Sequence, residues 1–200
     1  MFLCACHFLD PFHHDPMNSH FNFIAPFYDK AIPFSRLEKM LAVLDLPNAG
    51  TLLDAGGGTG RVATALRPHL GSVVVADVSW GMLAQARQKG LVAASTETER
   101  LPFADGTFDR VLMVDALHHV VHQGESVREM FRVLKPGGRL VIEEPDLRTF
   151  AVKLIAIAEK LALMRSHFLA PDQIAALFPK EAKVRVEAED HNAWVIAEKI

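Results

Sequence analysis

The stretch Thr51-Leu52-Leu53-Asp54-Ala55-Gly56-Gly57-Gly58-Thr59-Gly60 places an apolar run directly before an acidic residue and a turn rich in glycine. The following residues, Arg61 to Leu66, read as the start of a helix. Glycine adopts positive φ at little steric cost and lets the backbone approach a ligand closely. The order of strand, glycine loop and helix therefore predicts a cofactor-binding turn.

The spacing of the glycines argues against two common nucleotide sites. Gly56, Gly58 and Gly60 follow a G-x-G-x-G rhythm, whereas the dinucleotide fingerprint needs its third glycine at position 61, which is Arg61. A P-loop would end in Gly-Lys-Ser or Gly-Lys-Thr, and this loop does not. We therefore expect neither a dehydrogenase nor a nucleoside triphosphate enzyme.

Length and charge limit the organisation and the partners. The chain has 200 residues, half of them hydrophobic, which suits one well-buried α/β domain. We expect a leader with capping helices over residues 1–46 and one cofactor-binding unit over residues 47–200. The formal net charge is −3 and Lys and Arg are scattered, so we expect no nucleic acid partner.

The beginning of the sequence shows no recognisable targeting signal and no recognisable metal-binding pattern. Its apolar opening lacks a basic region, and Asp10 and Pro11 interrupt it, so neither a signal peptide nor a transmembrane segment is predicted. The only two cysteines lie too close together in sequence for a disulfide between them to stabilise the fold. This favours a reducing, cytoplasmic location. No metal site is predicted, because the spacing of the nearby zinc-type side chains matches no known pattern; these are Cys4, Cys6, His7, His13 and His14.

Short β-branched runs alternate with amphipathic helices after residue 50, which is typical of a parallel sheet covered on both faces. We expect the Lys135–Gly138 segment to be a turn that ends a helix, and an antiparallel hairpin to close the sheet. The expected strands are 51–54, 73–77, 91–94, 108–114, 139–143, 183–189 and 193–198. The expected helices are 34–44, 80–89 with Ser79 as its cap and Gly90 at its end, 149–164 and 171–178.

Polar features follow the carboxyl ends of successive strands, where open α/β sheets bind ligands. The glycine loop and Asp77 stand at the ends of the first two strands, and further acids or histidines follow the next three at 97–101, 115–119 and 143–145. Together with four sequence motifs they resemble the class I S-adenosylmethionine-dependent methyltransferases. The motifs are Leu53–Gly60, Asp77–Leu83, Leu101–Phe103 through Phe108–Asp109, and Arg132–Leu140.

This resemblance implies a fold, a cofactor and a set of roles. The fold is a Rossmann-like, mostly parallel seven-stranded sheet in the order 3-2-1-4-5-7-6, with helices on both faces and a C-terminal antiparallel hairpin. The cofactor is S-adenosylmethionine, which leaves as S-adenosylhomocysteine. Asp77 would accept both ribose hydroxyls, and Gly56, Gly58 and Gly60 would wrap the methionyl part and ribose. Asp54 would orient the loop or, through water, the amino group, and Glu97 would lie near the adenine amino group. Val78 and Leu101 would sandwich the adenine ring, Thr98 would also belong to the cofactor site, and Asp115 would begin the segment facing the methyl group.

Two histidines are candidates for proton transfer. His118 and His119 follow the fourth strand, where a base could reach a substrate proton, and the pKa of histidine suits that role near neutral pH. The alternative is ordinary packing or hydrogen bonding. Methyl transfer from a sulfonium mainly requires alignment and exclusion of water, so neither histidine is obligatory.

The leader offers a clue to the methyl acceptor. Phe23-Ile24-Ala25-Pro26-Phe27-Tyr28-Asp29 resembles the leader of the UbiE-type quinone-biosynthesis C-methyltransferases. The resemblance implies that Tyr28 caps the cofactor pocket and that the helix at 151–164 lines a site for a polyprenylated ring. The same helix would serve equally as a plain cover of the core.

Two hypotheses for function follow. The first is a methyltransferase acting on a small apolar or aromatic metabolite, with a quinone precursor as one candidate. The second is a cofactor-binding but inactive partner or regulatory subunit. The expected partner is a small-molecule methyl acceptor, and a homodimer is left open.

Overall fold

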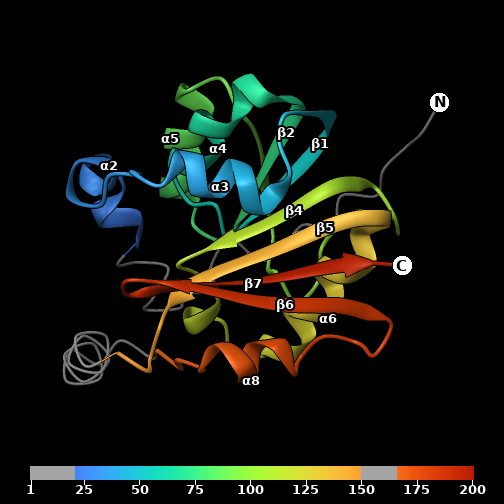
Figure 1. Cartoon of the computed structure of the whole chain (residues 1–200). Helices are drawn as coiled ribbons and strands as arrows, with labels where there is room; N and C mark the ends of the chain where they lie inside the picture. The colour runs from blue at the N-terminus through green and yellow to red at the C-terminus, as the bar shows by residue number, and fades with distance from the viewer. Residues whose placement is uncertain (1–20, 150–165) are drawn as a thin grey trace.

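A seven-stranded sheet forms the centre of the protein (Figure 1). The computed structural model describes residues 21–149 and 166–200. The strand order is β3-β2-β1-β4-β5-β7-β6, and β5 to β7 and β6 to β7 pair antiparallel while the other pairs are parallel. The predicted Rossmann-like order and the C-terminal hairpin are confirmed. The strands are β1 Asn48–Ala55, β2 Leu70–Asp77, β3 Val92–Ser95, β4 Phe108–Val114, β5 Leu134–Pro145, β6 Ala182–Glu189 and β7 Asn192–Lys199.

Helices cover both faces of the sheet. Apolar side chains of α3, α4 and α5 form one core cluster against it, and those of α6 and α8 form a second. The longer helices are α3 Leu37–Leu44, α4 Arg61–Leu66, α5 Trp80–Gln88, α6 Gln123–Val133 and α8 Pro171–Ala175. Short helical turns are η1 Ala25–Phe27, α2 Tyr28–Ala31, η2 Arg67–His69 and η3 Leu117–His119.

The central strands are apolar on both sides because each side faces a layer of helices. Successive strand residues point to opposite faces, so Leu53 belongs to the cluster under α6 whereas its neighbour Leu52 belongs to the cluster under α3. Val111 and Leu112 of β4 divide in the same way. This two-sided burial fixes the strands that end at the glycine loop and at Asp77.

The structure corrects one predicted turn. Lys135–Gly138 lies inside β5 and does not end the secondary structure. The register with β4 passes from Phe108↔Leu134 to Arg110↔Arg139, so the extra residues of β5 form a bulge. Gly137 adopts φ +75° there, which explains why the segment carries the composition of a turn.

Smaller differences concern element ends. The helix expected from Phe34 begins at Leu37, the one expected over 171–178 ends at Ala175, and the hairpin link is Asp190-His191 because Asn192 already belongs to β7. The helix expected over 149–164 and the cysteine and histidine group at 4–14 lie outside the described residues. Among the residues that the structure describes, no helix is long and apolar enough to cross a membrane. The division at residue 47 stays a prediction.

Candidate functional site

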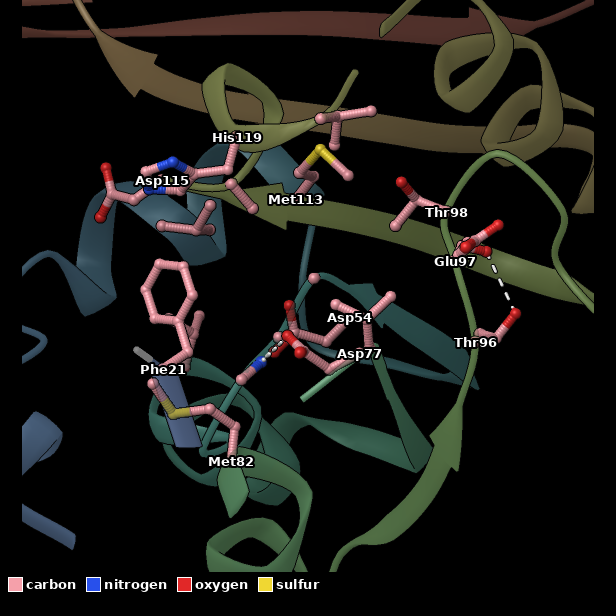
Figure 2. Close-up of a pocket in the computed structure, with 18 of the residues that line it drawn as sticks. Phe21, Asp54, Asp77, Met82, Thr96, Glu97, Thr98, Met113, Asp115 and His119 are labelled. Atoms are coloured by element: carbon pink, nitrogen blue, oxygen red, sulfur yellow. Dashed lines mark hydrogen bonds between the residues drawn. The ribbon is translucent and has the colours of Figure 1, made fainter. Parts of the chain in front are cut away.

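A pocket opens where β1, β2 and β4 end and beyond β3, at the edge of the sheet that the sequence indicated (Figure 2). Asp54 and Asp77 lie at the centre of the view, with Phe21 and Met82 to one side and Glu97 and Thr98 to the other. The structure thus gathers residues from five separate stretches of the chain. The predicted residues that line the pocket are Tyr28, Asp54, Gly56, Gly58, Asp77, Val78, Glu97, Thr98, Asp115 and His119.

Asp77 is held in place by backbone groups at both carboxylate oxygens. The N–H of Gly58 donates to Oδ2 at 2.9 Å, and the N–H of Ser79 donates to Oδ1 at 2.8 Å. Burial raises the pKa of Asp77, and the hydrogen bonds oppose that rise. Since each carboxylate oxygen can accept two hydrogen bonds, Asp77 keeps capacity for a pair of ligand hydroxyls.

Asp54 is a buried carboxyl of the site with one oxygen that lacks a hydrogen-bond partner among the described residues. Its side chain is 1% exposed, and its Oδ2 accepts no hydrogen bond from any described residue. Burial raises the pKa of Asp54 to about 7, the nearby charge of Asp77 adds to the rise and Arg61 opposes it. A buried carboxylate oxygen without a donor is costly, so this position suits a ligand that brings a donor or a positive charge.

The glycine loop is shaped by positive φ angles. Gly56 and Gly58 have φ +68° and +54°, and the N–H of Gly56 donates to Ala76 O at 2.7 Å. Gly60, also assigned to the ligand, does not line the pocket. A Cβ at Gly60 would lie 2.3 Å from Leu91 Cδ1, so this glycine permits close packing at the start of α4.

His119 lines the pocket, whereas His118 does not. His118 Nδ1 lies 2.5 Å from Glu144 Oε2, and its ring stacks on Phe168 with centroids 4.3 Å apart. Glu144 Oε1 also accepts the N–H groups of Ala116 and Leu117. His118 therefore helps to fix the turn after β4, and His119 is the histidine that can meet a ligand.

An ion pair joins the glycine loop to the turn after β4. Arg61 donates to Asp115 Oδ2 at 2.9 Å, and Asp115 adopts φ +51°, an uncommon conformation for a residue other than glycine. Tyr28 lies against the same pair. Burial raises the pKa of Tyr28, the charge of Arg61 opposes the rise and that of Asp115 adds to it.

Several lining residues were missed by the sequence reasoning. Arg61 has a clear signal, since it directly follows the glycine loop, but the sequence pattern predicts only the start of a helix there. The apolar lining had no local signal, because it depends on how distant segments meet. Leu101, expected beside the adenine, is instead buried in the core cluster under α6. The missed lining residues are Phe21, Gly57, Arg61, Val62, Met82, Thr96, Glu99, Met113, Val114, Ala116, Val120 and Val121.

The pocket has an acidic half and an apolar half. Asp54 and Asp77 by the loop, with Glu97 and Glu99 beyond β3, outnumber the cationic Arg61. Met113, Ala116, Val120 and Val121 line the side of the turn after β4, beside His119. The acidic half suits a ligand with hydroxyls and positive charge, and the apolar half suits a second ligand that is itself apolar. No group of three or more metal-ligating side chains occurs within residues 21–149 and 166–200.

Comparisons with known proteins agree with this geometry. Residues 53–142 match the family described as "Methyltransferase domain". The chain is 36% identical over 151 residues to demethylmenaquinone methyltransferase of Mycolicibacterium vanbaalenii, covering 76% of this chain and 64% of that protein. It is 43% identical over 104 residues to the ubiquinone/menaquinone biosynthesis C-methyltransferase UbiE of Pseudomonas putida, covering 46% of this chain and 41% of the relative.

A solved structure shares the fold. The chain superposes on a Thermotoga maritima methyltransferase, described as S-adenosylmethionine-dependent and as a "possible histamine N-methyltransferase", with a TM-score of 0.78. The match covers 92% of this chain and 100% of the other at 22% identity, which supports the fold alone. The chain spans less than two thirds of the length of the two curated relatives.

Proposed function

We propose that this chain, whose residues 53–142 match the methyltransferase domain family, is a class I S-adenosylmethionine-dependent methyltransferase that transfers a methyl group to a small apolar or aromatic acceptor. The observation that carries the proposal is the pairing of Asp77 and the unsatisfied Asp54 with the glycine loop at one end of the pocket. The apolar wall beside them supplies a place for the acceptor.

The acidic half of the pocket fits the cofactor. Asp77 takes the ribose hydroxyls, and Asp54 faces the cationic part of the methionyl moiety, directly or through water. Glu97, Thr98 and Val78 border the region left for the adenine. When bound, the cofactor supplies an electrophilic methyl group on a sulfonium, which departs as the thioether of S-adenosylhomocysteine.

The remaining work of the protein is alignment. Met113 and Val120 keep water from the acceptor side, and the turn after β4 fixes the position of His119. The acceptor nucleophile forms the new bond to carbon and loses a proton. His119 is the titratable group placed to receive that proton, and His118 supports the turn from behind through Glu144.

We further propose a quinol-type aromatic ring as acceptor. The two curated relatives are named for methylation in menaquinone and ubiquinone biosynthesis, and the Phe23–Asp29 leader resembles that group. An electron-rich ring carbon is nucleophilic once a ring hydroxyl is deprotonated. The apolar lining on the side of the turn after β4 suits such a ring.

Transfer of labelled methyl from S-adenosylmethionine tests the function. We expect turnover with a short-chain demethylmenaquinol kept reduced, and less with histamine or a simple phenol offered in parallel. Formation of S-adenosylhomocysteine with an amine but with no quinol would redirect the acceptor assignment. Cofactor binding without turnover in any arm would favour the inactive subunit, which no contact of the described residues supports.

A further inference from the structure

The leader segment, residues 21–31, is helical and docks beside α5 (Figure 1). At one end of the segment, Asn22 Oδ1 accepts from Ser79 Oγ at 2.8 Å and from the N–H of Gly81 at 2.7 Å. The backbone of Asn22 also fills the space above Gly81, because a Cβ there would lie 2.8 Å from Asn22 Cα and 2.9 Å from its carbonyl oxygen. Asn22 thus caps the first turn of α5.

At the other end, Asp29 joins a three-residue cluster. Thr59 Oγ1 donates to Asp29 Oδ1 at 2.5 Å, and Lys89 Nζ contacts Asp29 Oδ2. Lys89 Nζ also donates to Thr59 O at 2.8 Å. Thr59 is buried within the glycine loop, and Lys89 directly follows the last residue of α5, so Asp29 connects the leader to both.

The two chain segments between these contacts are similar in length. Asp29 lies seven positions after Asn22, and Lys89 lies eight positions after Gly81. Helical chain advances about 1.5–2 Å per residue, so both spans cover about 11–13 Å. The leader segment is therefore fastened by Asn22 to the first turn of α5 and by Asp29 to Lys89, just after the last residue of α5.

We propose that Asn22 and Asp29 are positioning residues for cofactor binding, which fasten the leader segment so that Phe21 and Tyr28 stand at the pocket. This inference rests on the proposed function. The neighbours of the two fastening residues, Phe21 and Tyr28, both line the pocket, while neither Asn22 nor Asp29 does. Both contacts reach residues beside the groups proposed to hold the ligand. The N–H of Ser79 also donates to Asp77, and Thr59, which contacts Asp29, lies between Gly58 and Gly60.

The substitution Gly81→Ala tests docking of the leader segment without weakening the helix on which it docks. Gly81→Ala should push Asn22 away, yet alanine favours helix over glycine, so α5 itself is not weakened. Gly124→Ala is the matched control, because Gly124 is likewise the second residue of its helix and its Cβ would meet only Leu177 Cδ2 at an ordinary 3.9 Å. Asp29→Asn removes the charge at the second contact, and Asp105→Asn removes the charge of a more exposed ion pair whose residues do not line the pocket.

Two measurements on the full chain test these variants. Calorimetry with S-adenosylhomocysteine should show affinity lowered about tenfold by Gly81→Ala and by Asp29→Asn, with the two controls within about twofold of the wild type. Tyr28 is the only tyrosine, so incorporated fluorotyrosine gives one fluorine resonance that reports its environment. In both variants this resonance should shift toward that of the free amino acid, while the melting temperature of Gly81→Ala stays equal to or above that of the wild type.

The outcomes distinguish the two proposals. Unchanged affinity and an unchanged Tyr28 resonance in Gly81→Ala and Asp29→Asn, with wild-type binding intact, would overturn the positioning role alone. Absence of binding by the wild type would overturn the proposed function and the positioning role together.

Discussion

At the scale of single residues, the site depends on two aspartates whose carboxylate oxygens differ in the hydrogen bonds they receive. Asp77 has a backbone donor on each oxygen, whereas Asp54 has an oxygen without a donor among the described residues. A carboxylate already fixed by the backbone is ready to orient hydroxyls. One that is buried without a donor gains most from a cationic ligand.

We expect Asp77→Ala to weaken S-adenosylmethionine binding by about 2 kcal/mol, which is about thirtyfold in Kd, because charged hydrogen bonds to the ribose are lost. Calorimetry gives the affinity, and circular dichroism checks that the variant folds. Equal affinity in a folded variant would remove Asp77 from the site.

The pH dependence of binding should report Asp54. The folded protein holds a proton on Asp54 below its pKa of about 7, and a cationic ligand favours the ionised form. Affinity for S-adenosylmethionine should therefore rise about tenfold between pH 6 and 8, with release of a proton on binding. Titrations in buffers of different ionisation enthalpy measure that proton. An equally steep profile in Asp54→Asn would assign the effect to another group.

The same aspartate should limit the stability of the free protein. Because its pKa is raised on folding, its favourable contribution is complete below about pH 4 and is lost as the pH rises through about 7. Asp54→Asn should therefore gain on the order of 2 kcal/mol over the wild type on going from pH 5 to pH 8. Urea unfolding at both values measures this. A gain independent of pH would contradict the assignment.

At the scale of elements, a partly buried ion pair attaches the start of α3 to the sheet. Arg36 Nε donates to Glu143 Oε1 at 2.8 Å, and Trp194 Nε1 donates to Glu143 Oε2 at 3.1 Å. Glu143 is fully buried, and burial raises its pKa while Arg36 opposes the rise. The sequence placed an acidic pair after the fifth strand but could not show that Glu143 and Glu144 face opposite sides of it.

Arg36→Ala should cost about 2–3 kcal/mol of unfolding free energy at pH 8, because Glu143 loses its cationic partner and keeps only Trp194. The cost should be smaller at pH 5, where the carboxyl can take a proton. Denaturant unfolding at the two pH values tests this, with Arg185→Ala, which removes a more exposed pair, as the control. An equal loss at both pH values would show that packing of Arg36, and not its charge, matters.

Element types and order were largely predictable because hydrophobic period, glycine turns and caps are local signals. Ser79 does cap α5, accepting from Met82 N at 3.3 Å, and β4 has the expected bounds. The bulge at Lys135–Gly138 was not predictable, since a glycine-rich break in a strand has the composition of a turn. Whether it interrupts the strand depends on pairing with β4, which is a tertiary contact.

At the scale of the whole molecule, the polar half of the site followed from sequence and the apolar half did not. Asp54, Asp77 and the loop stand at strand ends, so their meeting follows from the topology of a parallel sheet. Phe21 enters the pocket because the leader segment docks along α5, and it meets there Met82 of α5 itself. The contacts that fasten it, from Asn22 and Asp29, join residues far apart in sequence and leave no periodic trace.

Calorimetric titration of the purified chain with S-adenosylmethionine, beside S-adenosylhomocysteine and NADH, tests the central claim most directly. The claim is that the pocket formed by Asp54, Asp77 and the glycine loop is a binding site for the sulfonium cofactor. We expect saturable one-site binding of both sulfur compounds and none of NADH. Binding of NADH, or no binding of either sulfur compound by the folded chain, would contradict the claim.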